Sequence, residues 1–130
     1  MKVLFLIYFA SVLKPAFSQQ GTDSLLIEKD YANAKIYLKA LHYDSAVYFL
    51  KPVVYAFQQS QYWDRYAEAC YDLAEAYRIP AKYDSAILAV HEGLSRLNKS
   101  VGQRTLAFAN LLGERAVLRW HRGFLDSALV

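Results

Sequence analysis

Apolar and small residues recur every three or four positions through most of the chain, which is the spacing of a helix with one buried face. Between Tyr62 and Arg78 they occupy positions Tyr66, Ala69, Cys70, Leu73, Ala74, Ala76 and Tyr77. Pro80 predicts the end of this helix, because the residue before a proline is pushed out of the helical conformation. A second amphipathic stretch follows, with an inner stripe at Ala86, Val90, Leu94 and Leu97. The pattern predicts two consecutive helices joined by a short turn.

The same arrangement recurs along the chain. The tripeptide Asp-Ser-Ala begins at Asp44, Asp84 and Asp126, at spacings of 40 and 42 residues, and the same spacings relate Ala34, Ala74 and Ala116. We expect each aspartate to be the N-cap or a first-turn residue of the second helix of a hairpin. The alanines at 46, 86 and 128 are expected to be small because the paired helix crosses there. Gly93, inside a predicted helix, suggests the close approach of a neighbouring backbone.

Two stretches do not fit this scheme simply. Pro52 lies inside the second helix of the first unit, so that helix is expected either to kink there or to break at Lys51. At the carboxyl end, a second helix of a third hairpin is expected to begin with the apolar residues Phe124, Leu125, Ala128, Leu129 and Val130. Their apolar stripe would lack a partner, which suggests that these 130 residues are the amino-terminal part of a longer polypeptide.

The second unit, Cys70-x2-Leu73-Ala74-x2-Tyr77 followed by Ala86-x3-Val90, resembles the tetratricopeptide repeat pattern W-x2-L-G-x2-Y and A-x3-F. The first unit matches at Ala34, Tyr37, Tyr43, Ala46 and Leu50, and the third at Leu112, Ala116, Gly123 and Ala128. The chain departs from the family in having cysteine in place of the tryptophan, no closing proline, and a period longer than the usual ~34 residues.

The resemblance covers about residues 22–130. It implies an all-α, right-handed α-solenoid of antiparallel helix pairs, with repeats at about 22–60, 61–100 and a truncated 101–130. This helical repeat domain would occupy residues 19–130, after an amino-terminal export signal.

The first residues are typical of a secretory signal peptide. Lys2 precedes an eleven-residue apolar run from Val3 to Leu13, and Ala16 and Ser18 occupy the small positions of a cleavage site. The run is much shorter than the ~20 residues that span a bilayer, so a retained anchor is the weaker alternative. We therefore expect residues 1–18 to be removed, and an exported periplasmic or extracellular chain without stable membrane insertion.

Charge and chemistry point away from several function classes. Removal of residues 1–18 takes away two lysines and lowers the formal charge by two, from +3 to +1, so no nucleic-acid partner is expected. Cys70 is the only cysteine and is expected to be a small buried side chain. His42, His91 and His121 have no metal-ligand spacing, and no phosphate-binding loop or nucleophile motif occurs. We expect no catalytic residues, no metal and no cofactor.

The family resemblance implies that the first helices of the units line a concave groove. The residues that it places there are Glu28, Tyr31, Lys35, Lys39, Glu68, Tyr71, Glu75, Arg78, Asn110 and Trp120. Tyrosine and arginine side chains favour a protein or peptide ligand. The alternative is that the tyrosines fill gaps between helices. Asp64, Glu68 and Asp72 are expected to form a solvated row, with Arg65 and Arg78 paired to Glu68 and Glu75 at i, i+3.

These features lead to two hypotheses of different classes. The first is a non-enzymatic, exported interaction module that binds a protein or peptide and serves as the sensing or scaffold arm of a longer protein. Such arrays resemble the amino-terminal parts of bacterial CHAT-type peptidases and sensor histidine kinases, whose catalysis would lie beyond residue 130. The rival is a structural protein that self-associates through its truncated carboxy-terminal repeat.

Overall fold

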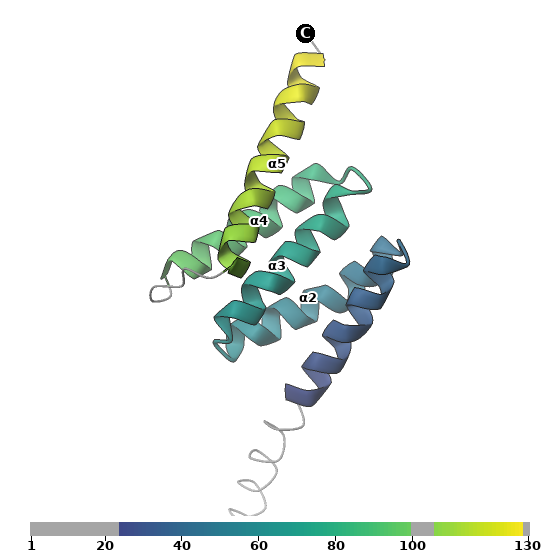
Figure 1. Cartoon of the computed structure of the whole chain (residues 1–130), viewed down its shortest axis with the longest axis vertical. Helices are drawn as coiled ribbons and strands as arrows, with labels where there is room; N and C mark the ends of the chain where they lie inside the picture. Colours follow the sequence, from purple (N-terminus) through teal and green to yellow (C-terminus); the bar gives the residue numbers. More distant parts are fainter. Residues whose placement is uncertain (1–23, 100–105, 129–130) are drawn as a thin grey trace, which may run out of the picture.

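The described residues of the computed structural model, 24–99 and 106–128, form helices joined by short turns and contain no strand. The first helix spans residues 24–39. It is followed by α2 (Tyr43–Gln59), α3 (Trp63–Arg78), α4 (Tyr83–Lys99) and α5 (Leu106–Ala128) (Figure 1). The all-α prediction is confirmed for this part of the chain. The predicted signal peptide, residues 1–18, lies outside the described residues.

The three described turns have the same backbone structure. Each contains one non-glycine residue in the left-handed region, with φ of 63° at Leu41, 57° at Gln61 and 66° at Ala81. The next residue donates its N–H to a carbonyl five positions earlier, at 2.9–3.0 Å for the pairs His42–Tyr37, Tyr62–Phe57 and Lys82–Tyr77. This is the Schellman arrangement that closes a helix and reverses the chain. The helices that these three turns join are therefore antiparallel.

The helix α3 lies at the centre of the molecule. It packs against α2, α4 and α5, and α4 also packs against α5 (Figure 1). The helix at 24–39 joins this group through Tyr31, whose ring meets Phe57 of α2 edge to face. Ala46 and Ala86, two of the three alanines predicted at the helix crossings, are confirmed as buried with no measurable exposure, and Ala34 and Ala74 are buried to the same extent. The side chain of the third, Ala128, lies outside what the structure describes.

Asp44 and Asp84, the first two aspartates of the repeat, are first-turn residues rather than N-caps. Asp44 and Asp84 each lie in the first turn of a helix, and the N-cap of α2 is His42, whose side chain makes no capping hydrogen bond. The exposed Asp44 carboxylate instead accepts a hydrogen bond from Lys82 Nζ at 3.2 Å. The aspartate therefore complements the helix dipole and links the turns of adjacent units.

Pro52 does not break the second helix. The helix α2 is continuous from Tyr43 to Gln59 with Pro52 inside it, so the alternative of a break at Lys51 is wrong. Pro52 lies on the solvent side, and Tyr48, whose carbonyl would have been the hydrogen-bond acceptor, is 75% exposed. The acceptor left without its usual partner is therefore on the face where water is available, which lowers the cost of the proline.

The predicted third hairpin is absent, because α5 continues as one helix from Leu106 to Ala128 and contains both Gly123 and Asp126. Ala116 is exposed, so the prediction that it repeats the buried role of Ala34 and Ala74 is also wrong. The reason is that α5 packs only against α3 and α4 among the described helices from α2 onward, whereas α3 is covered by three neighbours. The last turns of α5 extend past the other helices (Figure 1).

Candidate ligand-binding site

A hollow of about 260 Å³ lies on one face of the molecule. Its lining comes from the helix at 24–39, from α3 and from α5, and consists of Tyr31, Lys35, Glu68, Tyr71, Asp72, Ala107 and Asn110. Five of the ten residues that the family resemblance assigned to a groove are therefore brought together: Tyr31, Lys35, Glu68, Tyr71 and Asn110.

Tyr31 is part of the core and does not present its ring to solvent. Only 1% of the residue is exposed, and its hydroxyl donates to Asp72 Oδ2 at 2.6 Å. Its ring packs on Phe57 with centroids 5.7 Å apart and an interplanar angle of 81°. The expectation of an exposed Tyr31 is wrong because Phe57 of α2 and Asp72 of α3 enclose the side chain. Tyr71, the equivalent residue forty positions later, is only half-buried.

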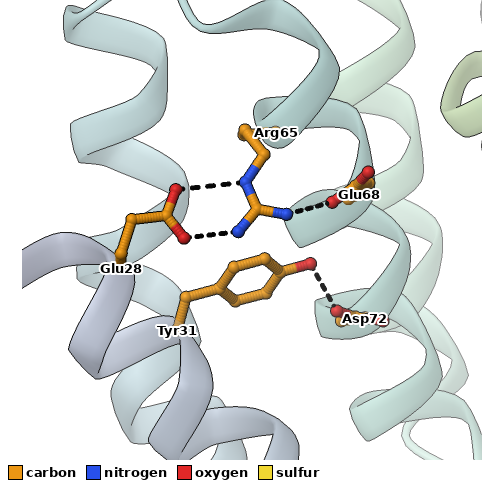
Figure 2. A network of polar contacts seen from close by, with 5 residues as sticks. All are labelled: Glu28, Tyr31, Arg65, Glu68 and Asp72. Carbon is orange, nitrogen blue, oxygen red and sulfur yellow. Dashed lines mark hydrogen bonds and ion pairs between the residues drawn. The ribbon is translucent and has the colours of Figure 1, made fainter. Parts of the chain in front are cut away.

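A polar network borders the hollow beside Tyr31 (Figure 2). The Arg65 guanidinium lies between two carboxylates: it donates to both oxygens of Glu28 and, through Nη1, to Glu68 Oε2 at 2.7 Å. The predicted i, i+3 pair of Arg65 with Glu68 is confirmed. The hydrogen bond to Glu28 is the main reason that the pKa of Arg65 is raised. The bond joins the helix at 24–39 to α3 and limits how far Glu28 is free to contact a ligand.

Burial sets the electrostatics of the hollow. It is the main cause that raises the pKa of Asp72, while the hydrogen bond from Tyr31 acts in the opposite direction. Burial also raises the pKa of the Tyr71 hydroxyl, so this group stays a neutral donor at neutral pH. The lining holds two carboxylates, Glu68 and Asp72, against one amine, Lys35, whose Nζ lies 4.5 Å from the centre of the Tyr31 ring. The hollow therefore favours groups that donate hydrogen bonds or carry positive charge.

The other predicted groove residues lie elsewhere. Arg78 does not pair with Glu75 as expected; its Nε donates to Glu114 Oε1 of α5 at 2.5 Å. Lys39 is exposed and does not line the hollow. Trp120 is 66% exposed near the end of α5, where its ring stacks on Phe124.

Sequence reasoning missed Glu114, the one charged residue that is buried in the described part of the chain, at 3% exposure. The helical period indicated that Glu114 is buried, because it falls on the same stripe of α5 as Ala107, Leu111 and Leu118. An acid on an apolar stripe indicates a charged partner on a neighbouring helix. Which cation it pairs with depends on the packing of α5 against α3.

The side chains that could carry other chemistry are dispersed. Cys70 is 2% exposed, as predicted, and burial raises the pKa of its thiol to about 12. In the part of the chain that the structure describes, no group of three or more histidine, cysteine or acidic residues could hold a metal ion. None of the described helices combines the length and the apolarity needed to cross a bilayer.

Comparisons with protein-family models, with curated proteins and with solved structures found no match to this chain. The function must therefore be argued from the geometry of the chain itself.

Proposed function

We propose that this chain is a non-catalytic interaction module of the tetratricopeptide type, a right-handed solenoid that binds a peptide segment of a protein partner. The proposed binding face is the one formed by the helix at 24–39, α3 and α5. The observation that carries the proposal is the shared hollow, in which side chains from three helices separated by roughly forty residues converge. The signal-like pattern of residues 1–18 supports an exported protein.

The accessible groups in the hollow suit a peptide. Asn110 is exposed and can both donate to and accept from a peptide backbone, while the half-buried ring of Tyr71 offers an amphipathic surface. The excess of carboxylates in the lining favours a ligand with at least one basic side chain. We therefore expect an extended peptide that places a lysine or arginine beside Glu68 and Asp72.

The test uses a display library of random twelve-residue peptides as the probe, selected on the purified chain. We expect basic residues to be enriched among the selected peptides. Binding of the best peptide, measured by isothermal titration calorimetry, should weaken about tenfold in Asn110→Ala and in Tyr71→Ala, because interface tyrosines contribute strongly to affinity. Tyr48→Ala is the matched control, since Tyr48 lies on α2, is 75% exposed and does not line the hollow.

The proposal is contradicted if the selection yields no peptide that binds this face, or if Tyr48→Ala weakens peptide binding as much as Tyr71→Ala does. Thermal unfolding of each variant shows whether a loss of binding reflects a loss of fold. The same samples can be examined by sedimentation velocity for self-association.

Self-association is the second candidate function, and one observation favours it. Val117, Trp120 and Phe124 lie on one side of α5, are 39%, 66% and 64% exposed, and include a stacked pair of rings. An exposed apolar stripe of this kind marks an interaction surface. A dimer that Trp120→Ser dissolves, together with a failure of the peptide selection, would favour this alternative.

A further inference from the structure

A second hollow, of about 430 Å³, lies between α4 and α5 on a different surface from the proposed peptide site. Its floor is apolar, with Val90, Leu94 and Leu118 each at most 5% exposed. The α5 side of its rim is cationic, with three exposed arginines, and the α4 side contributes the exposed imidazole of His91. The three arginines are Arg115, Arg119 and Arg122. No acidic residue of the described chain lines this groove.

The internal repeat indicates what kind of object fits there. At the repeat spacings of 40 and 42 residues, the groove positions His91, Leu94, Ser95, Arg115 and Arg119 correspond to Lys51, Val54, Tyr55, Leu73 and Tyr77 of the preceding unit. All five of those earlier residues lie on α2 and α3 and line a hollow whose remaining wall is α4. One unit earlier, the same surface is therefore bordered by an amphipathic helix, α4, which packs on α3.

The burial of α5 supports this equivalence. The helix α3 is packed on both sides, so that Cys70, Leu73 and Ala74 are buried against its neighbours. Their equivalents on α5 are Leu112, which is only partly buried, and two exposed residues, Arg115 and Ala116. Of these three positions Arg115 lines the groove, so a position that is buried under a neighbouring helix on α3 is open on α5 among the described residues.

We propose that the groove between α4 and α5 binds an amphipathic helix that carries carboxylates. The repeat specifies the helical shape of the ligand, and the arginine rim specifies its charge. The helix α4 provides the precedent, because its Glu92 lies in the same hollow as Lys51, the equivalent of His91. Carboxylates opposite Arg115 and Arg119 would give charge-assisted hydrogen bonds at the edge of an apolar contact. This inference does not depend on the proposed peptide site.

Two synthetic helices that copy residues 83–99 serve as probes. The acidic probe carries Arg96→Glu and Lys99→Glu, and the basic probe carries Asp84→Lys and Glu92→Lys. Binding of each labelled peptide to the full chain is measured by fluorescence anisotropy. We expect the acidic probe to bind at least about tenfold more tightly than the basic one, and to weaken as salt is raised, since rim charges are screened.

Protein variants locate the contact. Replacing two of the three groove arginines, Arg115→Glu with Arg119→Glu, should weaken the acidic probe by about tenfold or more. Arg96→Glu in the protein is the matched control. Arg96 is also exposed, but it lines the other hollow, the one bounded by α2, α3 and α4. It should change the affinity by less than about twofold. If the double glutamate variant loses helicity by circular dichroism, the glutamine pair Arg115→Gln with Arg119→Gln replaces it, with a smaller expected loss in the same direction.

The proposal is overturned if both probes bind equally, if Arg96→Glu weakens binding as much as the groove variants, or if the groove variants bind normally. The proposal is also overturned if the protein alone forms a dimer, the groove variants dissociate that dimer, and the acidic probe fails to dissociate it. The occupant of the groove would then be a second copy of the chain. Asn110→Ala should leave the acidic probe unaffected, so that failure of this proposal and failure of the peptide site can be told apart.

Discussion

At Gly93, α4 packs tightly against α3 and α5. A Cβ atom built on it would lie 3.1 Å from Cys70 Cβ and Sγ and from Leu111 Cδ2. The sequence predicted the close approach of a backbone at this position; the nearest atoms are instead side chains of α3 and α5. Gly113 of α5 is the opposite case, because a Cβ there would meet nothing within 4 Å.

The two glycines make a matched pair of substitutions. We expect Gly113→Ala to stabilise the protein by about 1 kcal/mol, which is the difference in helix propensity between the two residues. Gly93→Ala gains the same propensity but overpacks the contact with Cys70 and Leu111, at a cost of about 1–3 kcal/mol, and should be destabilising on balance. Urea unfolding of both variants measures the difference. Equal stabilisation by the two alanines would show that the contact at Gly93 relaxes freely.

At the scale of the elements, the ion pair between Arg78 and Glu114 fixes the carboxyl end of α3 against α5. The Glu114 side chain is 2% exposed and that of Arg78 is 22% exposed, so the acid is the more deeply buried partner. A buried pair adds little stability compared with apolar residues, but removal of one partner leaves an uncompensated charge.

A double-mutant cycle tests this reading. Arg78→Met should lower the free energy of unfolding by about 3 kcal/mol, because the carboxylate of Glu114 is left buried without a cation. Arg78→Met combined with Glu114→Leu should recover most of that loss, since both charges are then absent. The measurement is urea unfolding at neutral pH. If the effects of the two single changes simply add, the residues are not coupled and the interpretation is wrong.

The helices themselves follow from local signals, and the contacts between them do not. The 3.6-residue period and Pro80 predict a helix from Tyr62 to Arg78, and α3 begins one residue later. Tyr31 could equally have filled a gap or faced a groove, because its partners Phe57 and Asp72 are far away in sequence. The sequence did not predict that α5 continues through Gly123. By the repeat spacing Gly123 corresponds to a turn position, and glycine is common at helix ends. Whether the helix continues there depends on what packs beside it.

For the molecule as a whole, the partly buried carboxyl of Asp72 couples folding to pH. Burial raises its pKa above the ordinary value of 3.8, so between the two values the folded chain binds more protons than the unfolded chain. This contribution to stability is fully present below the ordinary pKa and is lost as pH rises through the folded pKa. Ionised Asp72 therefore weakens the fold at neutral pH.

We expect Asp72→Asn to remove this dependence. The difference in unfolding free energy between the variant and the unmodified chain should grow in favour of the variant from about pH 4 toward neutral pH. Tyr31→Phe should act in the opposite direction, because it deletes the hydrogen bond that holds the pKa of Asp72 down. Urea unfolding across this pH range measures both. Parallel pH profiles for all three proteins would contradict the assignment to Asp72.

The three described chain reversals, at Leu41, Gln61 and Ala81, each connect helices that lie side by side. Most of the packing is therefore made between stretches that are close in sequence, and little chain entropy is lost before a hairpin begins to form. Proteins whose contacts are mostly local fold fast. The shared turn geometry thus favours rapid formation of each of the three described helix hairpins.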